Sequence, residues 1–261
     1  MPVEEALRQR PVAMVAAHPD DETAGAGGFL PHMRIAAMVH VTDGAPRNLA
    51  DPRAAGYETR EEYAQARKEE LRKALEIAGF AGGRRLDVVD QEASADMASL
   101  ARRLAGIFDE VGATAVLTHP YEGGHPDHDA TAFAVHAACA LVPSPPDIYE
   151  FACYHQASGE EPAIETGRFL PHQDSGKIVV LAAADRERKT RMIACFATQL
   201  HMLRHFPVDE ERFRAAPVYD FSQSPHAGKL FYEYFDWGIT GERWRSRAAD
   251  AAQALGIPVT L

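Results

Sequence analysis

The sequence predicts an α/β protein in which a Rossmann-like, mostly parallel sheet carries helices on both faces and an irregular C-terminal extension follows. Short apolar segments of strand character alternate with segments of helical periodicity, an order typical of parallel sheets. Of the 261 residues, 46% are hydrophobic, which is enough to bury a sizeable core. No internal repeat or long Ser/Gly-rich linker divides the chain, so we expect one domain.

The predicted elements follow in chain order. The apolar segments predict strands at residues 12–17, 35–42, 85–90, 115–118, 147–154 and 177–182. Between the second and third strands, Tyr63, Leu71 and Leu75 recur at helical spacing among charged residues, and Gly79 is a plausible helix end. The same periodicity predicts further helices at residues 99–113, 126–141, 185–206 and 243–255.

The periodicity weakens from about residue 207. Residues 216–238 are rich in aromatic and turn residues, which suggests a lid or a strand pair packed across the main fold. We therefore expect a single domain over residues 1–261, with its core at about 11–206 and the extension at about 207–261.

Composition argues against several classes of partner. The 27 Lys and Arg residues face 38 Asp and Glu residues, a net charge of −11 without a basic run, so no nucleic acid partner is expected. The three cysteines are far apart, which argues against a disulfide framework or a thiolate metal site. There is no apolar leader and no run of 18 apolar residues, so we expect no membrane association and a cytoplasmic location. A homo-oligomer is left open.

The first predicted strand ends in an unusual concentration of charge. In "VAMVAAHPDDE" a buried segment runs directly into His18, Asp20, Asp21 and Glu22. Mutual repulsion raises the cost of ionising these carboxylates together. The pattern therefore predicts a positive species among them.

Other strands end in similar residues. In an open parallel sheet, ligands bind beyond the carboxyl ends of the strands, so these ends belong together. The segments "HPDDE", "TDG", "DQE" and "THPYEGGHPDH" bring the following side chains to one rim: His18, Asp20, Asp21, Asp43, Asp90, Glu92, His119, Glu122, His125, Asp127 and His128.

The last of these segments opens a helix. Pro126 suits a first helical turn, which places His128 in that turn and His125 just before it, so that both imidazoles can face the same crevice. Two histidines and a carboxylate from the first strand form a nitrogen and oxygen site without thiolate. Such a site suits Zn²⁺ in an open catalytic arrangement, and nickel, cobalt or iron(II) fit nearly as well.

These residues also carry a family resemblance. "AHPDDE" and "GHPDH" resemble the two signatures of the PIG-L or LmbE-like family of zinc-dependent N-deacetylases. "RKEELRKALEIAG" is similar to the Arg-x-x-Glu helix of that family, and "KTRMIACFATQ" to its Lys-containing helix that ends in a Gln. The resemblance spans most of residues 11–200.

The resemblance implies roles for five of the rim residues. It implies His18, Asp21 and His128 as metal ligands and Asp20 as the general base that takes a proton from an activated water. It implies a catalytic role for His125, and the chemistry favours a protonated His125, oriented by Asp127, that stabilises the oxyanion or protonates the departing amine. The expected reaction is removal of the acetyl group from an N-acetylated amino sugar or glycoside, with acetate as product.

Substrate contacts are expected from a further set of residues: Arg67, Asp43, Asp90, Tyr121, Glu122 and His226. Where family members often have a tyrosine two positions before the second-motif histidine, this chain has Gly123, so Tyr121 and Glu122 precede that position. Alternatives stay open for most of these assignments. Arg67 could instead pair with Glu70 or Glu62 on a solvated face, and Asp20, Asp43 and Asp90 could cap helices.

The remaining features have plainer interpretations. The glycines of "TAGAGG" favour close packing of the first helix on the sheet over phosphate binding. Several histidines have no partner spacing and are expected in the core or on the surface: His119, His136, His155, His172, His201 and His205. Two alternative functions remain, another metal-dependent hydrolase such as a non-sugar amidase or phosphoesterase, and a non-catalytic binding module.

Overall fold

We describe a computed structural model of the chain, which covers residues 1–159, 161–171 and 173–261. Within these residues seven strands form one sheet in the order β3-β2-β1-β4-β5-β9-β8. The strands of this sheet are β1 (Val12–Ala16), β2 (Ile35–Pro46), β3 (Arg84–Asp90), β4 (Ala115–Thr118), β5 (Asp147–Phe151), β8 (Lys177–Val180) and β9 (Glu210–Ala215). A separate antiparallel pair consists of β6 (Tyr154–Gln156) and β7 (Ile164–Thr166).

The sheet is mostly parallel, as the sequence predicts. Strands β3, β2, β1, β4 and β5 are parallel neighbours, whereas β9 is antiparallel to both β5 and β8. Because the chain builds β2 and β3 on one side of β1 and then β4 on the other, β1 and β4 flank the topological switch point of the sheet. A crevice for ligands is expected beyond the carboxyl ends of these two strands.

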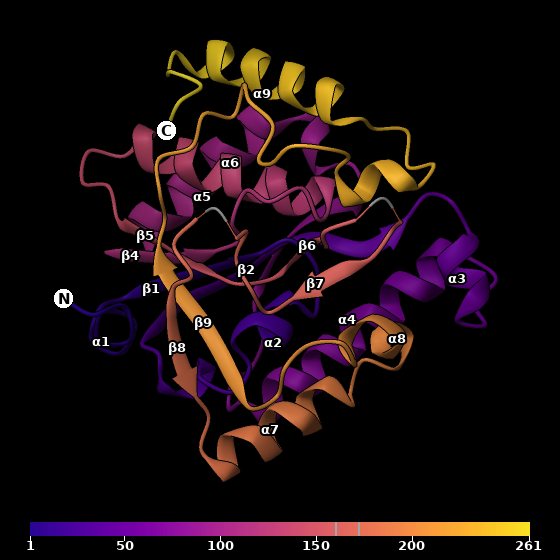
Figure 1. The fold of residues 1–261 in the computed structure, drawn as a ribbon. Coiled ribbons are helices and arrows are strands. Elements are labelled where there is room, and N and C mark those ends of the chain that lie inside the picture. Colours follow the sequence, from indigo (N-terminus) through magenta and orange to yellow (C-terminus); the bar gives the residue numbers. More distant parts are fainter. Residues whose placement is uncertain (160, 172) are drawn as a thin grey trace.

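Helices cover both faces of the sheet. The α-helices are α1 (Val3–Gln9), α2 (Asp21–Ala26), α3 (Ala50–Ala54), α4 (Arg60–Ile77), α5 (Met97–Glu110), α6 (Pro126–Leu141), α7 (Ala183–Ile193), α8 (Leu200–Leu203) and α9 (Gly241–Leu255). In Figure 1, α5 and α6 lie above the sheet with α9 packed over them, and α2, α4 and α7 lie below it. Among the helices that the structure describes, none is both long and apolar enough to cross a bilayer.

Local sequence explains where the main helices begin and end. Pro126 opens α6, and the side chain of Thr59 caps α4 in a reciprocal box with Glu62. Thr240 caps the start of α9, and Gly256 ends it with a left-handed backbone at φ 69°. These termini confirm the predicted helices at residues 126–141 and 243–255.

The helix α2 packs unusually close to the sheet. All five residues of β1 are buried, which is typical of a central strand covered on both faces. A side chain in place of Gly25 would collide with the ring of Phe151, and one at Gly28 would collide with Leu181. The glycines of this segment therefore permit close packing, as expected.

The fold differs from the sequence-based expectation in its second half. Residues 210–215 form β9 inside the main sheet, so the sheet continues past the expected core boundary at residue 206. The predicted strand at 147–154 breaks into β5 and β6, which belong to different sheets. The predicted helix at 185–206 breaks after α7, and the 3₁₀ helix η3 (Ala197–Gln199) and α8 follow.

The aromatic segment at residues 216–238 divides between two environments. Tyr219 and Phe221 pack with Tyr121 and Trp244 in the core beneath α9. The 3₁₀ helix η4 (Phe231–Tyr234) and the residues after it lie beside the cavity described below. Within the described residues this segment does not form the expected strand pair. It makes one isolated antiparallel β-bridge, between Asp220 and Thr260.

Candidate metal and catalytic centre

Two neighbouring strands deliver the central residues of the site. His18 and Asp21 follow β1, and His125 and His128 follow β4, its parallel neighbour. The chain separates the two pairs by about a hundred residues, yet the ring centroids of His18 and His128 are 5.0 Å apart. The strand ends therefore meet at the switch point, where the sequence places the crevice.

The side chains of His18, Asp21 and His128 converge on one point. His18 Nδ1 lies 3.1 Å from His128 Nε2 and 3.2 Å from Asp21 Oδ2, and His128 Nε2 lies 3.2 Å from Asp21 Oδ1. Donor atoms around a tetrahedral Zn²⁺ with bonds of about 2.0–2.2 Å are separated by about 3.3–3.6 Å. All three residues are buried, so this triad fits a divalent metal with only small side-chain movements.

The side chains around the triad hold it in place. The far nitrogen of His18, Nε2, lies 3.2 Å from Asp90 Oδ1 and 3.4 Å from Asp127 Oδ2. A proton on Nε2 would leave Nδ1 free to bind a metal, and the carboxylates would fix the ring. His119 stacks on His128 with centroids 4.1 Å apart, and the backbone N–H of Ala17 donates to His119 Nε2. His119 is thus a core residue, as expected, but one that supports the triad.

The protonation of His18 reflects these carboxylates. Burial lowers the pKa of His18, but Asp90, with Asp127 and Asp21, outweighs burial and holds the pKa well above 6.5. Burial by contrast lowers the pKa of His128 to about 3, so that ring is neutral at pH 7. Without a metal, the positive species among the carboxylates is the protonated His18.

Asp20 lies at the start of α2 but does not cap it. Its carboxylate makes no capping hydrogen bond, and Arg67 Nη2 donates to Asp20 Oδ2 at 3.1 Å. Burial raises the pKa of Asp20 to about 6, against the opposing charge of Arg67. The carboxylate faces the cavity with a pKa close to neutral pH, a property suited to a general base.

Arg67 is buried at the cavity rather than exposed on a solvated helix face. Its Nε donates to the carbonyl oxygen of Gly44, and only 2% of the residue is exposed. Tyr63, Arg67 and Glu70 recur along one buried face of α4. The alternative in which Arg67 pairs with Glu62 or Glu70 is therefore wrong.

His125 is oriented differently from the expectation. The Asp127 carboxylate accepts from the backbone N–H groups of Gln91 and Ala93, and only the backbone N–H of Asp127 contacts His125, at Nδ1. His125 Nε2 instead points to Asp90 Oδ1 at 3.8 Å. With Nδ1 accepting a hydrogen bond, the neutral ring carries its proton on Nε2.

The expected protonation of His125 is not supported either. Burial and the positive charge of His18 hold the pKa of His125 well below 6.5. The ring is therefore neutral at pH 7, and it can donate a hydrogen bond but not a full proton.

The structure separates the expected substrate contacts into two groups. Arg67 and Asp90 line the cavity, whereas Asp43, Tyr121, Glu122 and His226 are not among its lining residues. The Asp43 carboxylate contacts Arg60 and the backbone N–H of Ala45. The Tyr121 hydroxyl donates to the carbonyl oxygen of Gln223, and Glu122 is paired with His155. A substrate role for these four residues stays a prediction that their placement does not support.

Sequence reasoning missed much of the cavity, which has a volume of about 400 Å³. Polar residues that it did not assign to the site are Asp51, Tyr63, Gln91, Gln199 and His201. Unassigned apolar and aromatic residues are Ala24, Tyr154, Met202, Leu203, Phe206, Phe231, Phe235 and Trp237. The Gln that ends the family-like Lys helix is one signal that was available, because Gln199 Nε2 donates to the hydroxyl of Tyr63. Of the other histidines, His172 lies outside the described residues.

Comparison with known proteins identifies relatives of this site. Residues 13–139, which contain the triad, Asp20 and His125, match the family described as PIG-L, GlcNAc-PI de-N-acetylase. Over 140 residues the chain is 32% identical to a probable N-acetyl-alpha-D-glucosaminyl L-malate deacetylase 2 of Bacillus cereus. The match covers 52% of this chain and 63% of that relative, so the chain spans less than two thirds of its length.

Solved structures show the same fold. The A40926 pseudoaglycone deacetylase Dbv21 matches with a TM-score of 0.60 at 20% identity, over 81% of this chain and 100% of that chain. The zinc-inhibited form of teicoplanin deacetylase Orf2 matches with a TM-score of 0.58 at 16% identity, over 79% of this chain and 98% of that chain. At such identities the likeness is one of fold.

Proposed function

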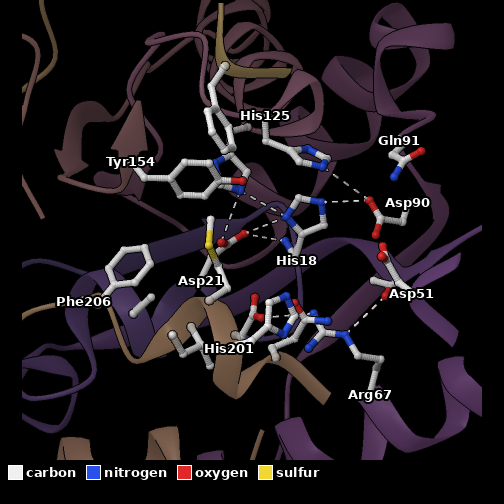
Figure 2. A pocket seen from close by; sticks show the side chains of 18 of the residues that line it. His18, Asp21, Asp51, Arg67, Asp90, Gln91, His125, Tyr154, His201 and Phe206 are labelled. Atoms are coloured by element: carbon white, nitrogen blue, oxygen red, sulfur yellow. Dashed lines mark hydrogen bonds and ion pairs between the residues drawn. The ribbon is translucent and has the colours of Figure 1, made fainter. Parts of the chain in front are cut away.

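Because residues 13–139 of this chain match the PIG-L family, we propose that it is a metal-dependent N-deacetylase that hydrolyses the acetamide of an N-acetylated amino sugar or glycoside. The observation that carries the proposal is the convergence of His18 Nδ1, His128 Nε2 and the Asp21 carboxylate beside Asp20 in a buried cavity. Figure 2 displays His18 and Asp21 at the centre of this cavity. Zn²⁺ is the preferred ion for such a donor set, and other divalent transition metals remain open.

The triad would hold the ion through two neutral imidazoles and one carboxylate. When bound, such an ion polarises an amide carbonyl and lowers the pKa of a water from 15.7 toward about 7. The triad lines the cavity, so an ion held by its three donors would have room for a further ligand there, as in catalytic rather than structural sites.

Asp20 takes a proton from the attacking water in this proposal. It contributes no atom to the triad and it faces the cavity. Arg67 fixes its carboxylate and keeps it ionised against the cost of burial. As the water oxygen bonds to the amide carbon, Asp20 holds the proton until the C–N bond breaks and the amine nitrogen takes it up.

His125 stabilises the negative oxygen that forms during attack. Its neutral ring offers an Nε2–H donor on the cavity side, because the backbone N–H of Asp127 occupies Nδ1. Asp127 is then a positioning residue, through its backbone toward His125 and through its carboxylate toward His18. A preorganised donor of this kind is worth about a hundredfold to a thousandfold in rate in other enzymes.

The polar side of the cavity suits the hydroxyl groups of a sugar. Arg67 Nη1 is buried and has no hydrogen-bond partner among the described residues. Asp51, Asp90, Gln91 and His201 line the cavity around it. Together these groups supply both donors and acceptors for hydroxyls.

Two-metal phosphoester hydrolysis is less well supported. A second group of candidate ligands, Asp90, His125 and Asp127, shares His18 with the triad. In this group, Asp90 and Asp127 lie beside His18 Nε2, whereas the triad uses Nδ1 on the other side of the same ring. Two ions held by the two nitrogens of one ring would lie farther apart than the about 3.5–4 Å of two-metal sites. A non-sugar amide remains a substrate to be tested.

The direct test measures acetate and free amine together. The chain is loaded with Zn²⁺, Co²⁺ or Ni²⁺ and incubated with N-acetylglucosamine, its glycosides and a non-sugar acetamide, and bound metal is counted. We expect equimolar acetate and amine from the sugars, a loss of at least a hundredfold in Asp20→Asn with metal retained, and loss of metal in His128→Ala. Asp43→Asn is the matched control, because Asp43 lies in the last part of the neighbouring strand β2 but outside the cavity lining.

Each other outcome counts against the proposal in a distinct way. Full activity in Asp20→Asn would exclude Asp20 as the base. Binding of the amides without release of acetate by the parent protein would favour a binding module. Release from the non-sugar acetamide alone would move the assignment to another amidase.

A further inference from the structure

The cavity has two ends of opposite chemical character, one on each side of the triad. In Figure 2, Asp51, Arg67, Asp90 and Gln91 lie on one side of His18, and Phe206 lies beyond Asp21 on the other. The first four residues form the polar end. Phe206 shares a hydrophobic cluster with Ala24 and Leu203, and Met202 packs against that cluster. These four lining residues form the second end, which we call the apolar end, and none of their side chains has a hydrogen-bonding group.

The apolar end is mostly enclosed and lies next to the reacting centre. Ala24 is 3% exposed, Leu203 3% and Phe206 6%, whereas Met202 is partly exposed. Tyr154 connects this end to the triad, because its ring lies edge-on to His128 with centroids 5.0 Å apart and to Phe206 with centroids 6.3 Å apart. A group that enters the apolar end is therefore adjacent to the atom under attack.

The rim of the cavity has a separate aromatic surface. Phe235 is 40% exposed and stacks on Trp237 with centroids 4.8 Å apart, and Trp237 covers His125. An aglycone, which is attached to the sugar rather than to the acyl group, would reach this open rim. The enclosed apolar end is then left for the acyl group itself.

On the premise of the proposed deacylation, we propose that the acyl group removed from the sugar amine is longer than acetyl. The amide divides the substrate into an amine part and an acyl part, and the triad divides the cavity in the same way. The sugar hydroxyls lie at the polar end, and a chain of several carbons fills the apolar end. Hydrolysis then releases the amino sugar and a short-chain to medium-chain carboxylate.

An acetyl group uses little of this apolar surface. Its single methyl group cannot contact the side chains of Met202, Leu203 and Phe206 together, so most of the apolar end would stay unfilled. Burial of each further methylene contributes a free energy that corresponds to about a fourfold gain in kcat/KM. From acetyl to hexanoyl, four methylenes therefore predict a gain on the order of a hundredfold.

The test compares two matched substrate series with the metal-loaded protein. In the first, glucosamine carries N-acetyl, N-butanoyl, N-hexanoyl or N-octanoyl groups. In the second, N-acetylglucosamine carries methyl, butyl, hexyl or octyl aglycones. We expect kcat/KM to rise at least tenfold along the acyl series and to change less than threefold along the aglycone series.

The outcomes separate this inference from the proposed function. Turnover of the N-acetyl compound without any rise along the acyl series would overturn the inference and leave the deacetylase function standing. A rise along the aglycone series alone would also overturn it, because the apolar group would then be on the amine side. No release from any compound would overturn both.

A variant pair locates the effect. Met202→Trp should fill the apolar end and lower the ratio of hexanoyl to acetyl kcat/KM at least tenfold. Leu200→Trp is the matched control on the same helix, since Leu200 is 45% exposed and lies outside the lining. The preference for the hexanoyl over the acetyl amide should also appear in Kd values, measured calorimetrically with Asp20→Asn, which binds without turnover. Equal Kd values for the two amides would contradict the proposal.

Discussion

The proton on His18 occupies the place that a metal would take. Without an ion, the charged ring carries a proton on each nitrogen: Nδ1 lies 3.2 Å from Asp21 Oδ2, and Nε2 lies 3.2 Å from Asp90 Oδ1 and 3.4 Å from Asp127 Oδ2. Replacing this proton by a divalent ion raises the charge of the cluster by one. Exchange of the proton for a metal links the occupancy of the site to pH.

Metal binding should therefore release a proton from His18. The pKa of His18 is held above 6.5, so below that raised pKa the ring is charged and must lose its proton before it becomes a ligand. We expect the affinity for Zn²⁺ to fall about tenfold for each pH unit below this range. Calorimetry in two buffers of different ionisation enthalpy counts the protons, and a release of zero at pH 6 would contradict the assignment.

Arg67 should set the acid limb of the pH–rate profile through Asp20. A general base must be ionised, so activity falls as the pH drops through the pKa of Asp20, about 6 in the metal-free site. Arg67 lowers this pKa, so Arg67→Gln should move the acid limb to higher pH. Arg72→Gln, an exposed change on the same helix, should leave the limb in place. An unmoved limb in Arg67→Gln would mean that another group governs it.

At the level of single residues, sequence reasoning succeeded where strand ends position the backbone. It placed His18, Asp21 and His128 together because parallel neighbouring strands end at one edge. It also expected Tyr121 and Glu122 at this edge, but they lie outside the cavity lining although they follow β4. Their backbone is held by the Asp129 carboxylate, which accepts from the N–H groups of Glu122 and Gly123, and Tyr121 stacks on Trp244 in the core. The direction of the Tyr121 side chain thus depends on Trp244 of α9, a helix far along the chain.

At the level of elements, β9 was missed because its charges are paired inside the protein. Glu211 and Arg214 are buried in a central strand, where apolar residues are the usual signal. Arg214 pairs with Glu150 on β5, and Glu211 pairs with Lys189 on α7. A sequence pattern cannot reveal such pairs, because each partner comes from a distant element.

The Lys189–Glu211 pair should stabilise the position of α2. Glu211 also accepts the backbone N–H groups of Gly28 and Phe29, just after this helix. Lys189→Met leaves a buried carboxylate without its cation and should lower the free energy of unfolding by about 3–5 kcal/mol, as measured in urea. The double variant with Glu211→Gln should cost less than the two single changes added together.

The control for this pair is Lys68→Met, because Lys68 is exposed on α4. We expect a change within about 0.5 kcal/mol for it. If Lys189→Met is as mild as this control, the pair contributes no net stability.

At the level of the whole molecule, the second half of the chain encloses a centre built by the first. Residues 13–139 hold the triad, whereas the apolar and aromatic walls come mostly from residues 154–237. Two contacts join the halves beside the cavity. Glu70 accepts from the backbone N–H and the hydroxyl of Thr198, and Gln199 contacts Tyr63.

Metal should stabilise the entire fold, because the triad joins segments that are distant in sequence. Free Zn²⁺ at a hundred times its Kd adds about 2.7 kcal/mol to the free energy of unfolding when only the folded state binds it. We expect a chelator to lower the Tm of the parent protein by several degrees and to leave the Tm of His128→Ala unchanged. Equal Tm values of the parent protein with and without chelator would place the ion elsewhere or exclude it.

The fold class was predictable because alternating strands and helices dominate the first two thirds of the sequence. The walls of the cavity were not, because residues 185–206 read as one continuous helix. The break after α7 turns Met202 and Leu203 toward the cavity, and it depends on buried contacts such as that between Glu70 and Thr198.

The separation of the triad from the cavity walls along the chain has an evolutionary consequence. A substitution or insertion within residues 199–206 or 231–237 alters the shape of the cavity without touching a single triad residue. Descendants of one ancestral gene can therefore differ in substrate preference while they catalyse the same reaction. A chimaera that exchanges these two segments would transfer the substrate preference of one descendant to another.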